Sequence, residues 1–179
     1  MSTVALVRAL TGFSRVVSTA PRLTSQELDT LTGGPDDHDR FANWLATASP
    51  SVVGAGAEPW SDRTMLAEID GTGRFEVVRL LTPVATAAIA RLLQAGDPVG
   101  PILANRPRQC FELLCDPGTT DDPALYGAVR SGLTLVCPRP GRTARGRYWL
   151  SVPQPGLLTR PANLVRALLT DAPILGDAE

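Results

Sequence analysis

The fold of this 179-residue chain is decided by one stretch, LAEIDGTGRFEVVRLLTPVATAAIARLLQAG, residues 66–96. Apolar and polar residues alternate over 64–70 and again over 74–80, a pattern typical of half-buried β-strands. The Gly-Thr-Gly sequence at 71–73 separates these runs, so we predict that they form a β-hairpin. Beyond the second run the apolar residues change to a helical period, which predicts a helix near 83–95 covering one face of the sheet.

The later part of the chain continues this mixture of strands and helices. The segments GPILANRPRQCFELLC, LTLVCP and GRYWLSVP predict strands separated by Pro- and Gly-rich loops. The segment RPANLVRALLTDAP predicts a closing helix. Its residues expected to face inward are Leu164, Val165, Leu168 and Leu169. The fold class is therefore predicted as α+β, with a mixed or antiparallel sheet and helices packed on it.

The chain is predicted to have two parts, residues 1–59 and 60–179. The first is a region of short helices followed by the Gly- and Pro-rich connector SPSVVGAGAEPW. One of its helices is expected in DDHDRFANWLATASP, which starts with acids, favourable at a helix N-terminus, and stops before Pro50. The second part is the α+β domain.

Composition limits the classes of protein to consider. The hydrophobic content of 44% is ordinary for a globular protein. No apolar run approaches the roughly 20 residues of a membrane span, so no membrane partner is expected. Arg8 and Arg15 interrupt the first apolar segment, unlike a signal peptide, which predicts a cytoplasmic protein. The three cysteines, Cys110, Cys115 and Cys137, form no CxxC pair and are expected to be buried free thiols.

Charge is distributed unevenly along the chain. All 17 basic residues are arginine, and this, with abundant Ala, Gly and Pro, indicates a GC-rich, actinobacterial source. Residues 123–170 contain seven arginines and no acid, whereas residues 1–122 contain ten arginines and fifteen acids. A basic C-terminal half of this kind favours an anionic partner such as nucleic acid or a nucleotide.

Five segments occur in an order that suggests a known family. They are PWSDRTMLAEIDGTGRFEVVRLL, ATAAIARLLQAGDPVGPILAN, RQCFELLCDPGT, YWLSVPQPG and LTRPANLVRALL. In this order they resemble the small actinobacterial proteins of the bifunctional DNA primase–polymerase family. The resemblance spans residues 60–170 and implies a primase–polymerase or RRM-like sheet. It also implies nucleotide addition with divalent metal, held by two carboxylates two residues apart on one strand.

The residues at the positions that this resemblance assigns to catalysis differ from the family pattern. Arg79 and Leu81 occupy the places of the two carboxylates, and a guanidinium repels a metal ion while leucine offers no lone pair. Gln109 and Cys110 lie where a phosphate-binding histidine is expected. The third acid is sought within 123–170, where none occurs. The resemblance thus implies a non-catalytic relative, with no metal or other cofactor.

Two groups of acids leave alternatives open. Glu68, Asp70 and Glu76 could form a displaced metal site, since the first two lie two apart on one strand. Asp70, however, adjoins Gly71 and is better explained as a turn residue that bonds its own backbone. The DDHD segment at 36–39 could likewise bind metal, but consecutive residues do not converge on one centre, which favours a solvated helix start.

The best candidate binding site is CPRPGRTARGRYW, residues 137–149. Arginines in a Pro- and Gly-rich loop, followed by aromatic residues on a strand, suit phosphate contact with base stacking. The predicted nucleic-acid-binding residues are Arg139, Arg142, Arg145, Arg147, Tyr148 and Trp149. The alternative is a solvated loop with Trp149 in the core.

Three functional hypotheses follow. The first is a non-catalytic protein that binds nucleic acid or nucleotide through its basic half. The second is a protein-interaction or regulatory protein on the same fold, with a protein partner. The third is an active primase or polymerase that uses an unorthodox set of acids.

Overall fold

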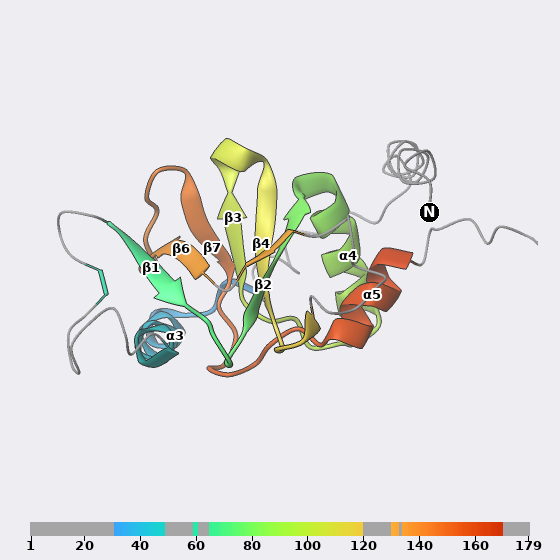
Figure 1. Ribbon diagram of the computed structural model, residues 1–179, viewed down its shortest axis with the longest axis horizontal. Helices are drawn as coiled ribbons and strands as arrows, with labels where there is room; N and C mark the ends of the chain where they lie inside the picture. Colours follow the sequence, from blue (N-terminus) through green and yellow to red (C-terminus); the bar gives the residue numbers. More distant parts are fainter. Residues whose placement is uncertain (1–30, 49–58, 61–64, 120–129, 133, 170–179) are drawn as a thin grey trace, which may run out of the picture.

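The computed structural model describes residues 31–48, 59–60, 65–119, 130–132 and 134–169 (Figure 1). The described part is an α+β structure of helices and two antiparallel sheets, which confirms the predicted class. The helical elements are α3 (Pro35–Ala48), α4 (Thr82–Gln94), the 3-10 turn η1 (Arg106–Arg108) and α5 (Pro161–Leu169). The strands are β1 (Leu66–Asp70), β2 (Glu76–Leu81), β3 (Ile102–Asn105), β4 (Cys110–Cys115), β5 (Arg130–Gly132), β6 (Thr134–Pro138) and β7 (Arg147–Ser151). None of the helices in these ranges is long and apolar enough to cross a bilayer.

The two strands of the opening stretch exist, but the predicted hairpin between them is wrong. β1 pairs with β6 in a two-stranded sheet, whereas β2 pairs with β4 and β5 in a five-stranded sheet. The connection is a corner in which the amides of Arg74 and Phe75 both donate to the Gly71 carbonyl, at 2.8 and 3.0 Å. A Cβ on Gly71 would lie 2.5 Å from the buried Phe75 ring. The chain therefore leaves one sheet and enters the other at this corner.

The five-stranded sheet has the order β5-β2-β4-β3-β7, with every neighbouring pair antiparallel. β5 and β6 follow each other with one residue between them, so they also pass from one sheet to the other. The pairs β1–β6 and β2–β5 therefore form one ribbon whose two halves belong to different sheets.

One face of the five-stranded sheet is covered by α4 and α5 (Figure 1). The predicted helix near 83–95 is confirmed as α4, whose buried side chains include Ile89 and Leu92. Arg91 joins the two helices, because its Nη1 donates to the Ala167 carbonyl of α5 at 2.7 Å. For α5 the prediction that Leu169 faces inward is wrong, because this residue is 48% exposed. Ala167 is buried instead.

The opposite face packs against α3 and the β1–β6 sheet. Phe41 of α3 meets Trp149 of β7 edge to face, with ring centroids 4.9 Å apart, and Leu45 is fully buried in the same cluster. The helix expected in 36–50 is confirmed as α3. This helix packs on residues of the domain that was predicted to begin at residue 60. The helices predicted nearer the N-terminus lie almost wholly within residues 1–30, outside the described residues.

Candidate functional site

The three carboxylates of the opening stretch have separate surroundings. Glu68 is exposed on β1, and Glu76 accepts the Gly118 amide at 2.8 Å. Asp70 is a turn residue, as predicted, because its Oδ1 accepts both the hydroxyl and the amide of Thr72. These two hydrogen bonds hold the pKa of Asp70 below its ordinary value, and the bond from the Thr72 hydroxyl has the larger effect. Within the described ranges no three His, Cys, Asp or Glu side chains are grouped to hold a metal ion.

The DDHD segment forms the start of α3 and its side chains make local contacts. Asp37 accepts the Gly34 amide at 3.0 Å, which satisfies a backbone donor at the helix start. The His38 Nε2 lies 2.9 Å from the Thr32 carbonyl oxygen. Asp39 pairs with Arg139 of the β6–β7 loop at 3.3 Å. These residues therefore fix the helix start and tie it to the loop.

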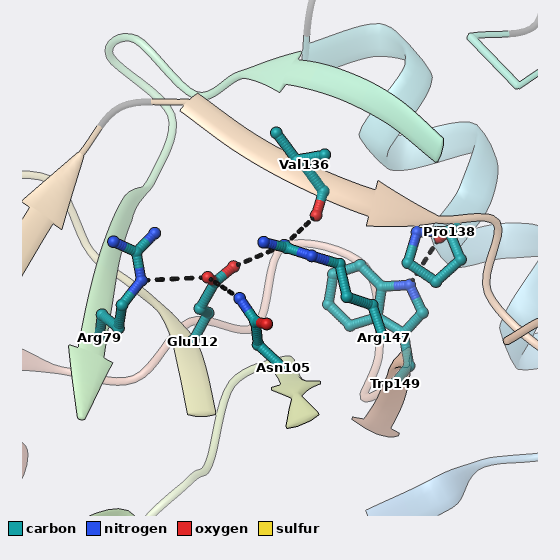
Figure 2. Close-up of polar contacts among 7 residues, drawn as sticks. All are labelled: Arg79, Asn105, Glu112, Val136, Pro138, Arg147 and Trp149. Carbon is teal, nitrogen blue, oxygen red and sulfur yellow. Dashed lines mark hydrogen bonds and ion pairs between the residues drawn. The ribbon is translucent and has the colours of Figure 1, made fainter. Parts of the chain in front are cut away.

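The most unusual polar group of the described structure is a buried carboxylate, Glu112, on β4 (Figure 2). Its side chain is 1% exposed and accepts from three donors. Oε1 accepts from Arg79 Nε at 3.0 Å and from Asn105 Nδ2 at 2.9 Å, and Oε2 accepts from Arg147 Nη1 at 3.3 Å. Burial of an ion is tolerated only when charge and hydrogen bonds compensate it, and here two guanidiniums and an amide do so.

Strand register explains why these side chains meet. Arg79 of β2 lies opposite Glu112, and Asn105 of β3 lies opposite Arg147 of β7. Arg147 extends over the sheet far enough to donate also to the carbonyl of Val136 in β6 (Figure 2). This network spans four strands of the five-stranded sheet and one strand of the smaller sheet.

The positions that the family resemblance assigns to catalysis lie beside this network. Leu81 is opposite Cys110 in the β2–β4 ladder and is 64% exposed. Gln109 ends η1 in the left-handed conformation, with a φ of 49°. Burial raises the pKa of the Cys110 thiol and Glu112 adds to the rise, while Arg79, Arg108 and Arg147 oppose it. Cys110 is thus a buried thiol beside the Glu112 network, opposite Asn105 in the β3–β4 ladder.

The other two cysteines are also buried and free, which confirms the prediction for all three. Burial strongly raises the pKa of the Cys115 and Cys137 thiols. Neither is therefore suited to act as a nucleophile or ligand at neutral pH.

The predicted arginine loop is divided by the structure into interior and surface residues. Arg147 belongs to the Glu112 network, and Arg139 pairs with Asp39. Trp149 is 8% exposed, and its indole N–H donates to the Pro138 carbonyl at 2.9 Å, so this ring packs in the core. Tyr148 is half-buried on β7, with the Arg106 guanidinium 5.3 Å from its ring centroid.

Arg142 and Arg145 remain exposed, and the fold places two further arginines next to them. Gly146 accepts the Arg106 amide at 3.1 Å, which joins η1 to the β6–β7 loop. Both connections lie at the same end of the sheet in Figure 1. We call the four exposed arginines of these two connections the basic edge: Arg106, Arg108, Arg142 and Arg145. None of them forms an ion pair with another residue of the described structure.

Arg145 adopts a backbone conformation that is unfavourable for its residue type. Its φ is 48°, followed by a φ of 73° at Gly146, and the amides and carbonyls of Ala144 and Arg147 close the turn in both directions. Such two-residue hairpin turns favour Asn, Asp or Gly at the first position. An arginine there costs stability, and such a cost is found most often where a side chain has a function.

Sequence reasoning did not identify Arg106, Arg108 or Glu112. The usable signals were an Arg-Pro-Arg triplet between two strands, at 106–108, and one acid inside the apolar run CFELLC. Comparison with protein-family models, with curated proteins and with solved structures gives no match for this chain. The resemblance to the primase–polymerase family therefore stays a prediction based on the quoted segments.

Proposed function

We propose that this protein binds the phosphate backbone of nucleic acid through the basic edge. One observation carries the proposal: the bond from the Arg106 amide to Gly146 brings arginines of η1 and of the β6–β7 loop to one end of the sheet. Exposed guanidiniums without acidic partners attract phosphates and release counterions when they bind them.

The stereochemistry of the basic edge supports backbone contact rather than reading of base sequence. Its four arginines lie on a 3-10 turn of three residues and on a loop, and neither provides a helix for the major groove. Tyr148 is the remaining aromatic candidate for stacking, and it already lies under Arg106. We therefore propose binding with weak sequence preference, and Trp149 is not included because of its burial.

The proposed role is binding without nucleotidyl transfer. The argument is chemical: Arg79 is engaged with Glu112, and Leu81 has no metal-binding atom. Extension of a primer with Mg²⁺ or Mn²⁺, lost in Glu68→Ala or Asp70→Ala, would contradict this part of the proposal.

Salt-dependent titration tests the binding itself. Four phosphate contacts predict a slope of log affinity against log salt of about −3, for single- or double-stranded oligonucleotides followed by fluorescence anisotropy. Arg142→Gln with Arg145→Gln should roughly halve the slope. Arg74→Gln is the matched control, because Arg74 is an exposed arginine at the corner between β1 and β2. A flat titration at low salt would refute the proposal and favour the protein-partner hypothesis.

A further inference from the structure

Arg79 is held in an uncommon way for an arginine in an ion pair. It contacts Glu112 through Nε alone, on the inner side of the guanidinium. Figure 2 shows its two terminal nitrogens pointing away from the carboxylate. They have no hydrogen-bond or ion-pair partner among the described residues, and the side chain is 30% exposed. The outer edge of this guanidinium is thus fixed in orientation and open to a ligand.

Glu112 has no capacity left to neutralise this edge. Both of its oxygens are engaged, and it is shared with Arg147, so two guanidiniums face one carboxylate. The network therefore carries an excess of one positive charge, two arginines against one glutamate.

We propose that the outer edge of Arg79 binds a phosphate group. Arginine offers two parallel N–H donors to a phosphate, and the net positive charge of the network favours an anionic ligand. The phosphate could be free in solution or stand at the end of a nucleic acid strand, since both present the same chemistry. This site is separate from the basic edge and does not depend on it.

Thermal unfolding in inorganic phosphate, against sodium chloride at equal ionic strength, tests the site. Phosphate should raise the Tm of the intact chain, because it binds only the folded state. Arg79→Gln should lower phosphate affinity by about tenfold or more, since charge-assisted hydrogen bonds are lost. Arg79→Lys should lower it less, because lysine keeps the charge and loses the paired donors. Arg74→Gln is the control that should retain the full rise in Tm. A wild-type chain without this rise, or an Arg79→Gln variant that keeps it, would overturn the proposal.

Glu112→Gln provides an independent measurement in the opposite direction. The substitution leaves Arg79 and Arg147 without a neutralising charge, so phosphate should raise the Tm of this variant by more than that of the wild type. An equal or smaller rise would overturn the charge argument.

A last pair of experiments identifies the source of the phosphate and separates this site from the basic edge. If strand ends are bound, an oligonucleotide with a terminal phosphate should bind more tightly than one ending in a hydroxyl, and Arg79→Gln should remove the difference. If free phosphate alone is bound, the two oligonucleotides bind equally while the rise in Tm persists. Arg142→Gln with Arg145→Gln should weaken strand binding and leave the effect of inorganic phosphate unchanged; loss of both would overturn the separation of the two sites.

Discussion

Glu112 supplies the negative charge that allows the guanidiniums of Arg79 and Arg147 to lie over the sheet. Removing it would leave Arg79 and Arg147 without their shared counter-charge, and breaking a buried ion pair in this way costs about 3–5 kcal/mol. We therefore predict that Glu112→Ala lowers the free energy of unfolding by that amount in urea denaturation. Glu68→Ala, at an exposed position of β1, should change it by less than about 0.5 kcal/mol. Similar losses in the two variants would mean that the network contributes little to stability.

Arg145 gives a prediction in which stability and binding move in opposite directions. Asparagine adopts positive φ more readily than arginine, so Arg145→Asn should raise the free energy of unfolding by about 0.5–1 kcal/mol. The same variant should bind oligonucleotides more weakly, because one phosphate contact of the basic edge is lost. Chemical denaturation and anisotropy on one protein preparation measure both effects. A more stable variant with unchanged binding would remove Arg145 from the proposed interface.

At the residue scale, sequence reasoning succeeded where the deciding contact is local. Asp70 bonds Thr72 two residues away, and adjacency to glycine was sufficient to place it in a turn. Glu112 could not be recognised in this way, because its two arginines lie 33 and 35 residues away and meet it only through strand register. For the same reason the sequence does not decide whether Trp149 stacks on bases or packs in the core, since Phe41 and Pro138 decide its burial.

At the element scale, the corner at Gly71 decides which sheet each strand joins. Any side chain at this position would meet the buried Phe75 ring and the Phe75 carbonyl oxygen, at 2.5 and 2.8 Å from the Cβ. Gly71→Ala should therefore lower the free energy of unfolding by about 1–3 kcal/mol, the usual cost of inserting atoms into a packed site. Gly73→Asn is the matched control, because Gly73 has a φ of 72° and open space around it, and asparagine tolerates that conformation. Equal effects in thermal or urea unfolding would show that the corner does not depend on the missing Cβ.

The same corner explains the one topological error of the sequence prediction. Alternation of apolar and polar residues specifies that 66–70 and 76–81 are strands, but it does not specify their partners. A Gly-Thr-Gly segment is typical of a tight hairpin, yet the chain uses residues 71–75 to turn around Phe75. Leu169 is a smaller error of the same kind: helical period places it near the inner face, and the end of α5 leaves it exposed.

At the scale of the whole molecule, the two cores each contain one buried thiol, Cys115 on the α4–α5 face and Cys137 on the α3 face. Their ordinary pKa is 9.0, and burial raises it in the folded state. Above about pH 9 the unfolded chain therefore loses protons that the folded chain keeps, so the free energy of unfolding should fall as pH rises. Each thiol contributes about 1.4 kcal/mol per pH unit to this fall.

Urea denaturation between pH 8 and pH 11 measures this slope. Cys115→Ala and Cys137→Ala should each reduce it by the contribution of one thiol, if the two cores unfold together. A slope that responds to one substitution alone would indicate that the cores unfold as separate units.

The pairing of β1 with β6 has a consequence for the newly made chain. The partners in this ladder are far apart in sequence, 64 positions from Asp70 to Thr134 and 72 from Leu66 to Pro138. A ribosome adds about 5–20 residues per second, so β1 leaves the exit tunnel roughly 3–14 s before its partner strand does. During this interval the backbone amides and carbonyls along this edge of β1 have no partner strand. Pairing across such a separation also slows folding, which gives a chaperone time to meet this segment.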